Sequence, residues 1–373
     1  MGHLDGTAKG QLRIGVIGMG FGAGVHLPAL GTLANVVVSG VADAGSGRAR
    51  IAAAKYAPRA RVFDNGHALA EWPGIDAVSI AVPPRQQAAI VRTAIDAGKH
   101  ILCEKPFGAG LDEITGLAAD AMGKGLVTAI GYEFRYDTAI AALCKAVREG
   151  RIGPVRRIAV TWLTGGGLDP NRPWSWRHDA GACGGVLLDW CSHVIDYAFL
   201  IAGADVTEIS ARTSITVLKR PDGRGGVADV TAPDSCEIAC LFANGVVGRY
   251  TVSNVQAAGI GHKIEVYGDS GRIVFHHAPP FTSRSKTLTL YDSNDEGLVV
   301  PIAETGAADG EDGNGDDRVA AFRELAQDFS AVAQGSTTAG RFPDFAAGER
   351  VWRVLEAARN SAAQGSAMRV QAA

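Results

Sequence analysis

The chain has 373 residues, of which 47% are hydrophobic and 20% are charged, and its formal net charge at pH 7 is -3. This composition is typical of a globular protein with room for two domains, and it excludes the fibrous and disordered classes. The small net charge gives no electrostatic reason to expect nucleic acid or a membrane surface as a partner. Glycines interrupt the first apolar run, so it has the pattern of neither a signal peptide nor a spanning helix.

The six cysteines are scattered along the chain without a C-x-x-C pair. This spacing disfavours a zinc ribbon and a thioredoxin-type redox motif, so we expect no metal site. Buried, reduced thiols are the simpler interpretation, and they favour a cytoplasmic location.

A glycine-rich turn follows the first expected strand, at residues 12–17. Gly18, Gly20 and Ala23 fit the pattern G-x-G-x-x-G/A, in which the first glycine makes a tight turn and the second lets the backbone approach a pyrophosphate. An apolar helical segment follows as far as Leu33. A lone glycine pattern is a weak signal in a chain with 48 glycines. The cofactor contacts expected from this turn are Gly18, Gly20, Phe21, Gly22 and Ala23.

The next expected strand, at residues 36–42, supports this interpretation because it ends at Asp43. A carboxylate at this distance from the glycine turn accepts hydrogen bonds from the adenosine ribose hydroxyls and repels a 2′-phosphate. We therefore expect NAD as the cofactor. NADP remains possible, because Ser46 and Arg48 lie close to Asp43 in the sequence.

Short apolar strands alternate with helical patterns up to residue 132, which is typical of a parallel α/β sheet. Val82, Pro83 and Pro84 stiffen a loop at the carboxyl end of one strand, where a dinucleotide would lie; a turn without a ligand is the alternative. We predict a Rossmann dinucleotide-binding domain over residues 1–132. The expected strands are 12–17, 36–42, 61–63, 77–81, 101–103 and 127–132, and the further helices are 47–56, 86–97 and 111–124.

The sequence Glu104-Lys105-Pro106 comes directly after the strand expected at residues 101–103. The charged pair therefore falls at the carboxyl end of a buried strand, which is the edge where open parallel sheets bind ligands. A lysine at this edge is a better candidate for chemistry than one on a solvated helix. A surface turn is the alternative interpretation.

After residue 132 the alternation stops, and a strand-rich region follows a linking helix expected at residues 137–149. Several of its strands alternate apolar and polar residues, which favours a large, mostly antiparallel open sheet. We predict that residues 133–373 form this C-terminal domain, so the fold class is α/β plus α+β. The acidic, glycine-rich run at 306–317 predicts a mobile loop. The expected strands are 155–163, 206–217, 235–241, 246–252, 263–268, 272–275 and 287–291, and the closing helices are 318–333 and 345–361.

A second charged group lies on a helix that is expected to open at the pair Gly184-Gly185 and to reach Tyr197. Asp189 and His193 are four residues apart, so one helix would place them on the same face. A carboxylate beside an imidazole can fix its tautomer and favour its protonated form, which suits a group that exchanges a proton near neutral pH. A surface pair or a core histidine is the alternative. The face expected to pack on the sheet contains Val186, Trp190, Val194 and Tyr197.

Residues 171–179 concentrate aromatic rings and hydrogen-bond donors, with Trp174, Trp176, Arg177 and His178 among them. Sugar rings present apolar C–H faces and many hydroxyls, so such a loop suits a polyol. Tryptophan and arginine also anchor protein interfaces, so an oligomer contact is an equal alternative.

These motifs together resemble the Gfo/Idh/MocA family of oxidoreductases over nearly the whole chain. Each motif alone is a weak signal, but the order and spacing of all of them together make the resemblance specific. The chain departs from the usual family pattern at Pro84 and Gln87, where Asn and His are common. The matching segments are Gly18-x-Gly20, Ala97-Gly98-Lys99-His100, Glu104-Lys105-Pro106, Gly131-Tyr132-x-x-Arg135, Gly184-Gly185-x-x-x-Asp189-x-x-x-His193-x-x-Asp196 and Val266-Tyr267-Gly268-x-x-Gly271.

The resemblance implies a catalytic set of Lys105, Asp189 and His193. In this set Lys105 lies beside the nicotinamide and the reacting hydroxyl, His193 exchanges the hydroxyl proton, and Asp189 orients His193. The further cofactor contacts that it implies are Ala81, Pro83, Glu104 and Lys105. The expected substrate contacts are Lys105, Arg135, Trp174, Trp176, Arg177, Asp189 and His193.

We therefore expect a cytoplasmic NAD(P)-dependent dehydrogenase that transfers a hydride between the nicotinamide and a secondary hydroxyl of a sugar, inositol or related polyol. One alternative is a redox-neutral glycosidase, epimerase or eliminase that returns the hydride to tightly bound NAD. A non-catalytic nucleotide-binding regulator is another. The resemblance also implies a homodimer or homotetramer that associates through the open sheet.

Overall fold

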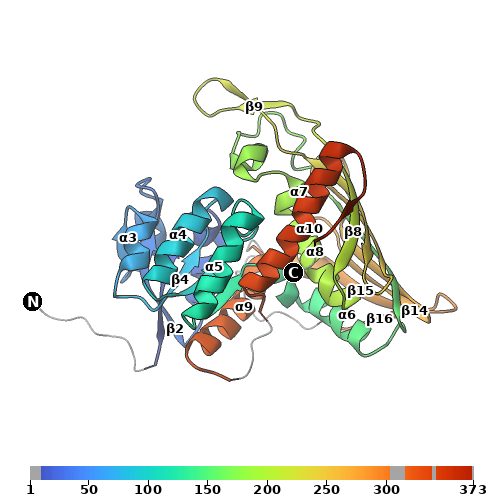
Figure 1. Cartoon of the computed structure of the whole chain (residues 1–373), viewed down its shortest axis with the longest axis horizontal. Coiled ribbons are helices and arrows are strands. Elements are labelled where there is room, and N and C mark those ends of the chain that lie inside the picture. Colours follow the sequence, from blue (N-terminus) through green and yellow to red (C-terminus); the bar gives the residue numbers. More distant parts are fainter. Residues whose placement is uncertain (1–9, 303–315, 338–341, 372–373) are drawn as a thin grey trace, which may run out of the picture. The chain divides into compact units, whose positions relative to one another are not determined.

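The computed structural model describes residues 10–302, 316–337 and 342–371. The chain divides into two compact units: the first contains Met1–Tyr136 and Asn314–Glu349, and the second contains Asp137–Gly313 and Arg350–Ala373. Each unit has its own main sheet (Figure 1). Most of the loop predicted at 306–317, namely residues 306–315, lies outside the described residues.

Six parallel strands form the sheet of the first unit, in the order β3-β2-β1-β4-β5-β6. The chain builds the sheet outward from β1 to β3 on one side and then from β4 to β6 on the other. Such a reversal of strand order leaves a crevice at the carboxyl ends of β1 and β4. The strands are β1 Leu12–Ile17, β2 Val36–Ala42, β3 Arg61–Phe63, β4 Ala77–Ile80, β5 His100–Cys103 and β6 Thr128–Ile130.

Helices cover both faces of this sheet, and its central strands are apolar for that reason. All four residues of β4 and five of the six in β1 are buried. α3, α4 and α5 form one layer (Figure 1), and α1, which contacts β2, packs with α2 and α9. The helices are η1 Gly22–His26, α1 Leu27–Leu30, α2 Arg48–Tyr56, α3 Gly66–Glu71, α4 Pro84–Asp96, α5 Leu111–Gly123, η2 Glu133–Tyr136 and α9 Arg318–Ala333.

α9 belongs to the first unit, although the sequence prediction placed everything after residue 132 in the second domain. Its Phe322 and Phe329 are fully buried in the same apolar cluster as Val16 of β1 and Leu30 of α1. The apolar face of α9 thus completes a core that the first 136 residues leave open, because burying this face is favourable only against a matching apolar surface.

Nine strands form the sheet of the second unit, in the order β16-β15-β14-β13-β7-β12-β11-β8-β17. All neighbours are antiparallel except β7 and β12, so the predicted mostly antiparallel sheet is confirmed. The strands are β7 Val155–Leu163, β8 Val206–Ser214, β11 Ser235–Phe242, β12 Val247–Ser253, β13 Gly261–Gly268, β14 Gly271–His277, β15 Lys286–Asp292, β16 Gly297–Val299 and β17 Met368–Arg369.

Burial alternates along the strands of this sheet, as in β11, where every second side chain is buried. α6 and α8 pack on the buried face (Figure 1). A separate hairpin of β9 and β10 extends from this unit. The remaining elements are α6 Thr138–Arg148, η3 Trp176–His178, η4 Ala180–Ala182, α7 Val186–Asp189, α8 Cys191–Ala202, β9 Lys219–Pro221, β10 Val227–Asp229, η5 Ser283–Ser285 and α10 Phe345–Gln364, which starts in the first unit and ends in the second.

The helix predicted from the glycine pair to Tyr197 is in fact broken at Trp190, and the segments Ala180–Asp189 and Cys191–Ala202 meet at 43°. At the break, the Ser192 hydroxyl donates to the Asp189 carbonyl at 2.9 Å, and the His193 amide donates to the Trp190 carbonyl at 3.1 Å. These bonds interrupt the regular i to i−4 pattern. Asp189 and His193 therefore lie on two sides of a bend and not on one face of a continuous helix.

No single helix of the described residues is long and apolar enough to cross a membrane, and only the bent pair Ala180–Asp189 and Cys191–Ala202 reaches that length and apolarity together. Eleven of the twelve residues of α8 are buried within the second unit. Its apolar composition is therefore that of a core helix.

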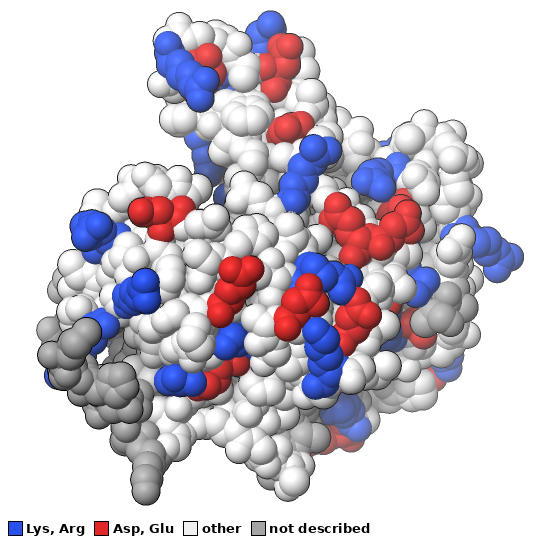
Figure 2. Space-filling view, turned by 60° about the vertical axis from the view of Figure 1, so that its left-hand side comes forward, with Lys and Arg blue, Asp and Glu red and all other residues white. Residues whose placement is uncertain are grey.

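Charged side chains of both signs are mixed over the described residues on the face in Figure 2, without one extended area of a single sign. Oppositely charged neighbours form ion pairs, such as Arg13 with Asp76 and Arg156 with Asp269, both at 2.6 Å. This mixture agrees with the net charge of -3.

Candidate functional site

The glycine turn after β1 lies at the carboxyl edge of the first sheet. Gly18 has φ +98, and a Cβ atom there would lie 2.5 Å from the Ala81 carbonyl oxygen. Its amide donates to the Ala42 carbonyl at 2.9 Å, so this residue joins the ends of β1, β2 and β4. A Cβ on Gly20 would meet nothing within 4 Å, whereas one on Gly22 would lie 3.3 Å from the Ala81 Cβ. The open backbone at Gly20 fits the close approach of a dinucleotide diphosphate, and Gly22 lets η1 pack on the sheet.

Phe21 precedes η1, and Ala23 lies within it. Both are partly exposed and pack against the apolar core of the unit. On the neighbouring strand end, the Ala81 amide donates to the Ile17 carbonyl at 2.7 Å, and Pro83 caps the start of α4. The residues predicted to contact the cofactor therefore lie along one sheet edge.

Asp43 follows β2 at the same edge and is buried. One carboxylate oxygen accepts from the Gly45 amide at 2.9 Å, and the other accepts from the Ser46 hydroxyl at 2.6 Å and the Ala49 amide at 2.9 Å. Burial would raise the pKa of Asp43, but these hydrogen bonds hold the pKa below its ordinary value. Asp43 is thus an ionised acceptor that also organises the start of α2.

Glu104 and Lys105 follow β5, and a buried histidine contacts Glu104. His26 of η1 places Nε2 3.2 Å from Glu104 Oε1 and Nδ1 2.8 Å from the Ser79 hydroxyl. The His26 ring also stacks on Phe322 of α9, with 4.0 Å between the ring centroids. Gly131 lies so close that a Cβ there would overlap the Glu104 carboxylate. The Glu104 side chain is therefore fixed by His26 and by its close packing on Gly131. Lys105, which is half-buried, is the next residue in the chain.

Gln87, at the family departure noted above, is fully buried near the start of α4. Its Nε2 donates to the Val82 carbonyl at 3.2 Å, and its Oε1 accepts from the Gly108 amide at 2.7 Å. One side chain therefore links the loop after β4 to the turn that contains Lys105.

Glu133 begins η2 and is almost completely buried. Burial, together with the negative charge of Glu104, raises the pKa of Glu133 to about 8, against the opposing charges of Lys105 and Arg318. Glu133 therefore keeps its proton at neutral pH. Arg135 lies in the same short helix and is half-buried.

In the second unit, two glycines bring Arg177 to Asp189. A Cβ on Gly184 would lie 2.5 Å from the Arg177 carbonyl oxygen, and Gly185, with φ +92, would place a Cβ 2.6 Å from the Pro233 ring. Because neither Gly184 nor Gly185 carries a side chain, the loop of η3 packs directly on the start of α7. Arg177 Nε consequently donates to Asp189 Oδ2 at 3.1 Å. Asp189, His193 and Asp196 are all buried.

The face predicted to pack on the sheet does so. Trp190 stacks on Trp162 of β7 with 4.5 Å between the ring centroids, and the Tyr197 hydroxyl lies 3.0 Å from Nε2 of His262 on β13. Burial lowers the pKa of His262 to about 3, so this histidine is neutral. These contacts fix α7 and α8, and with them Asp189 and His193, on the sheet.

The aromatic loop is anchored on the hairpin of β9 and β10. The Trp174 amide donates to the Pro221 carbonyl at 2.8 Å, and its indole Nε1 donates to the Asp229 carbonyl at 3.1 Å. Trp176 is half-buried, and the Arg177 guanidinium lies over its ring at 4.5 Å. Burial and the charges of Arg220 and Arg172 lower the pKa of His178 to about 4.

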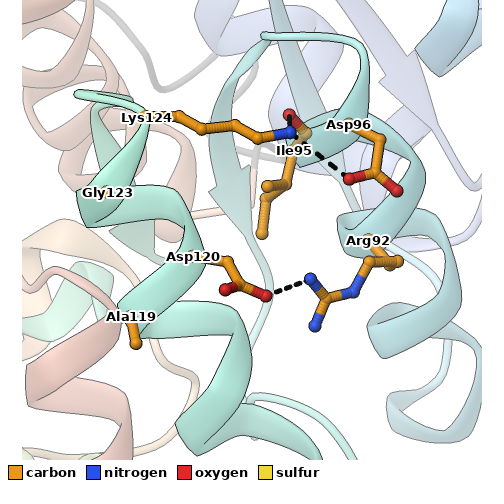
Figure 3. A pocket seen from close by; sticks show the side chains of 7 residues that line it. All are labelled: Arg92, Ile95, Asp96, Ala119, Asp120, Gly123 and Lys124. Carbon is orange, nitrogen blue, oxygen red and sulfur yellow. Dashed lines mark hydrogen bonds and ion pairs between the residues drawn. The ribbon is translucent and has the colours of Figure 1, made fainter.

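A surface groove of about 390 Å³ lies between α4 and α5 (Figure 3). Arg92 pairs with Asp120 across it, and Lys124 pairs with Asp96 at 3.3 Å and donates to the Ile95 carbonyl at 3.0 Å. The lining residues come from the C-terminal ends of the two helices. Because these helices run antiparallel to the strands, the groove lies at the amino edge of the sheet, opposite the glycine turn.

Among the described residues, no group of three or more His, Cys, Asp or Glu side chains could hold a metal ion. All six cysteines lie within the described residues, where they are buried and form no disulfide bond.

Sequence reasoning missed two buried polar residues at the cofactor edge, namely His26 and Ser79. They lie within otherwise apolar segments, a helix and a strand. A polar residue at a predicted core position is the signal that could have found them, because burial without a partner is costly.

Two family models match the chain. Residues 12–132 match the oxidoreductase family with an NAD-binding Rossmann fold, and residues 140–274 match the GFO/IDH/MocA C-terminal domain. The first match spans all six strands of the parallel sheet, and the second covers most of the second sheet.

Curated relatives extend this match to nearly full length. A levoglucosan dehydrogenase of Pseudarthrobacter phenanthrenivorans is 30% identical over 95% of this chain and 97% of its own. A myo-inositol 2-dehydrogenase of Thermotoga maritima is 28% identical over 75% of this chain and 78% of its own.

Solved structures agree with the sequence matches. A levoglucosan dehydrogenase in complex with NADH and levoglucosan is 28% identical, has a TM-score of 0.84 and covers 97% of this chain and 100% of its own. The parallel sheet with its glycine turn, the mixed second sheet and the two family models lead to one conclusion: the chain belongs to the Gfo/Idh/MocA family of NAD-binding oxidoreductases.

Proposed function

We propose that this protein is an NAD-dependent dehydrogenase that oxidises or reduces a secondary hydroxyl of a sugar, inositol or related polyol. The observation that carries the proposal is the buried arrangement on α7 and α8, in which Asp189 is paired with Arg177 and His193 follows across the bend. The names of the levoglucosan and myo-inositol relatives support a polyhydroxylated ring as the substrate. NADP is the alternative cofactor.

Three residues carry the proposed chemistry. His193 takes the hydroxyl proton in oxidation and returns it in reduction, and Asp189 orients its ring. Lys105 supplies a positive charge that stabilises the alkoxide as it develops. The nicotinamide, when bound, supplies the acceptor or donor of the hydride at its C4 position.

The carboxyl edge of the first sheet would hold the cofactor. Gly20 offers open backbone to the diphosphate, and Asp43 offers an ionised carboxylate to the adenosine ribose. The full proposed set is Gly18, Gly20, Phe21, Gly22, Ala23, Asp43, Ala81, Pro83, Glu104 and Lys105.

Side chains of the aromatic loop would contact the substrate. Trp176 offers an aromatic face for the C–H side of a sugar ring, and Arg177 offers hydrogen-bond donors to its hydroxyls. The proposed substrate contacts are Lys105, Arg135, Trp174, Trp176, Arg177, Asp189 and His193.

We also propose a cytoplasmic homodimer or homotetramer. The six cysteines, which are buried and form no disulfide among the described residues, support a reducing compartment. Leu241, Leu298 and Val299 expose apolar side chains on strands of the second sheet, which supports association through that sheet. Light scattering of the purified protein would measure the number of subunits, and a monomer would contradict this part of the proposal.

The test of the proposed activity is the absorbance of reduced nicotinamide while the purified protein is offered inositols, aldoses and their glycosides with NAD and, separately, with NADP. Sustained formation of reduced cofactor is the expected result. The Lys105→Met variant serves as the blank, since a contaminating dehydrogenase would leave its signal unchanged. Conversion of a glycoside in the same wells without reduced cofactor, detected by mass spectrometry, would show a redox-neutral enzyme instead.

A further inference from the structure

The residue that begins α9 lies over the side chain of Phe21, which belongs to the glycine turn. The Arg318 guanidinium carbon is 4.7 Å from the centre of the Phe21 ring, and Phe21 follows Gly20, whose backbone is open. The G-x-G-x-x-G/A pattern gave no reason to look for a side chain from this distant part of the chain.

The position of α9 against the turn is set by contacts along its whole length. Phe322 stacks on His26, the Tyr136 hydroxyl donates to Asp328 at 2.8 Å, and Asn35 donates to the Ser330 hydroxyl at 2.9 Å. Arg318 is therefore held over the turn by a packed helix, not by a surface loop.

Arg318 is paired with its neighbour Asp316, and the charge of Asp317 also acts on it, but the pair uses only some of its hydrogen-bond donors. Nε and Nη2 donate to the two Asp316 oxygens at 2.8 and 2.5 Å, and a guanidinium has five N–H donors in all. This carboxylate also fixes the plane of the guanidinium. The third acidic residue that acts on Arg318, Glu133, adds little negative charge at neutral pH, because burial and the charge of Glu104 raise its pKa.

We propose that Arg318 binds the diphosphate of the nicotinamide dinucleotide and supplements the backbone of the glycine turn. The diphosphate in this fold lies against the backbone that follows the second glycine, which here is the residue that Arg318 covers. A planar guanidinium can donate two parallel hydrogen bonds to phosphate oxygens. This inference rests on the cofactor binding of the family and does not require the proposed substrate.

Direct binding of NADH and of ADP-ribose, measured by calorimetry, tests the inference without turnover. We expect Arg318→Leu to weaken both ligands by about 10- to 100-fold, since a charge-assisted bond is lost, and Arg318→Lys to recover most of the affinity. Weaker NADH binding with unchanged ADP-ribose binding would overturn the inference, because ADP-ribose contains the diphosphate and lacks only the nicotinamide.

Two further variants separate a ligand contact from a structural role. Arg323→Leu removes another arginine of α9, paired with Glu324 at 2.6 Å, and should change neither affinity. Asp316→Asn removes the negative charge beside Arg318 and should leave NADH binding equal or tighter. If Asp316→Asn weakens binding as much as Arg318→Leu, the ion pair only supports the helix start and the inference is wrong. Circular dichroism confirms that each variant is folded.

Discussion

In the first unit the candidate residues directly follow neighbouring parallel strands, whereas in the second they come from a loop and from the two sides of a helix break. Gly18, Asp43 and Glu104 share one sheet edge because parallel strands end there together. Arg177 reaches Asp189 only because Gly184 and Gly185 carry no side chains. The first arrangement follows from topology, and the second depends on close packing.

This difference suggests a division of labour. A sheet edge suits a cofactor of constant shape, while a loop packed on a helix can change its side chains to suit different substrates. Changes in the first unit should mainly alter cofactor binding, and changes in the second should mainly alter substrate recognition. Lys105 and Arg135 should break this rule, because they lie in the first unit but are proposed to act on the substrate.

Lys105→Met is expected to have the largest effect. Turnover should fall by about 10³-fold or more, because the developing alkoxide loses its stabilising charge, while NADH affinity stays within about twofold. Steady-state kinetics and NADH titration measure the two quantities. Equal losses in both would mean that Lys105 acts only through cofactor binding and has no separate role in the chemistry.

His193→Ala should reduce turnover by about 10²- to 10⁴-fold through the loss of the proton acceptor, again with little change in NADH affinity. A variant with parental activity would remove His193 from the catalytic set.

Trp176→Ala should raise KM for the best substrate of the panel by about tenfold, through loss of an aromatic face, with kcat within about threefold. Trp72→Ala is the matched control, since it is also a half-buried tryptophan with an arginine over its ring, Arg61, but lies outside the aromatic loop. A similar rise of KM in both variants would indicate general loosening rather than substrate recognition.

Asp43→Ala should weaken NAD binding by about tenfold, since the ribose loses a charged acceptor, and should reduce the discrimination against NADP. KM for the polyol should be unchanged. Titration with NAD and with NADP measures the two affinities. If the ratio of these affinities is the same in the variant and the parent, the Asp43 carboxylate only organises the start of α2.

The smallest expected effect is on stability. Glu133 loses its proton near pH 8 in the folded chain and near its ordinary value of 4.5 in the unfolded chain, so the unfolded state binds fewer protons between these values. Stability of the parent should therefore fall as pH rises from about 5 to about 8.

Glu133→Gln removes this loss, so the variant should gain stability relative to the parent across that interval. Urea unfolding at both pH values measures the difference, and Glu71→Gln, at an exposed position, is the control. If the free energy of unfolding changes by the same amount between the two pH values in the variant and in the parent, Glu133 does not hold a proton in the folded chain.

The parallel sheet and its glycine turn were predictable because glycines and short apolar strands act locally. The second sheet was predictable in class, since alternation along β11 and β12 reports one buried face. The break at Trp190 was not, because it depends on one hydroxyl, that of Ser192, which competes for a backbone carbonyl. Partners distant in sequence, such as His26 and Glu104, leave no periodic signal that a single sequence reveals.

The return of α9 to the first unit also bears on how the protein is made. Phe322, Leu325 and Phe329 complete the core that begins with β1, so this core stays open until the ribosome has passed residue 333. The cofactor-binding unit, although it starts first, cannot complete its core until nearly the whole chain has been made. During synthesis its exposed apolar surface would need protection, and a nascent chain released before α9 would be prone to aggregate.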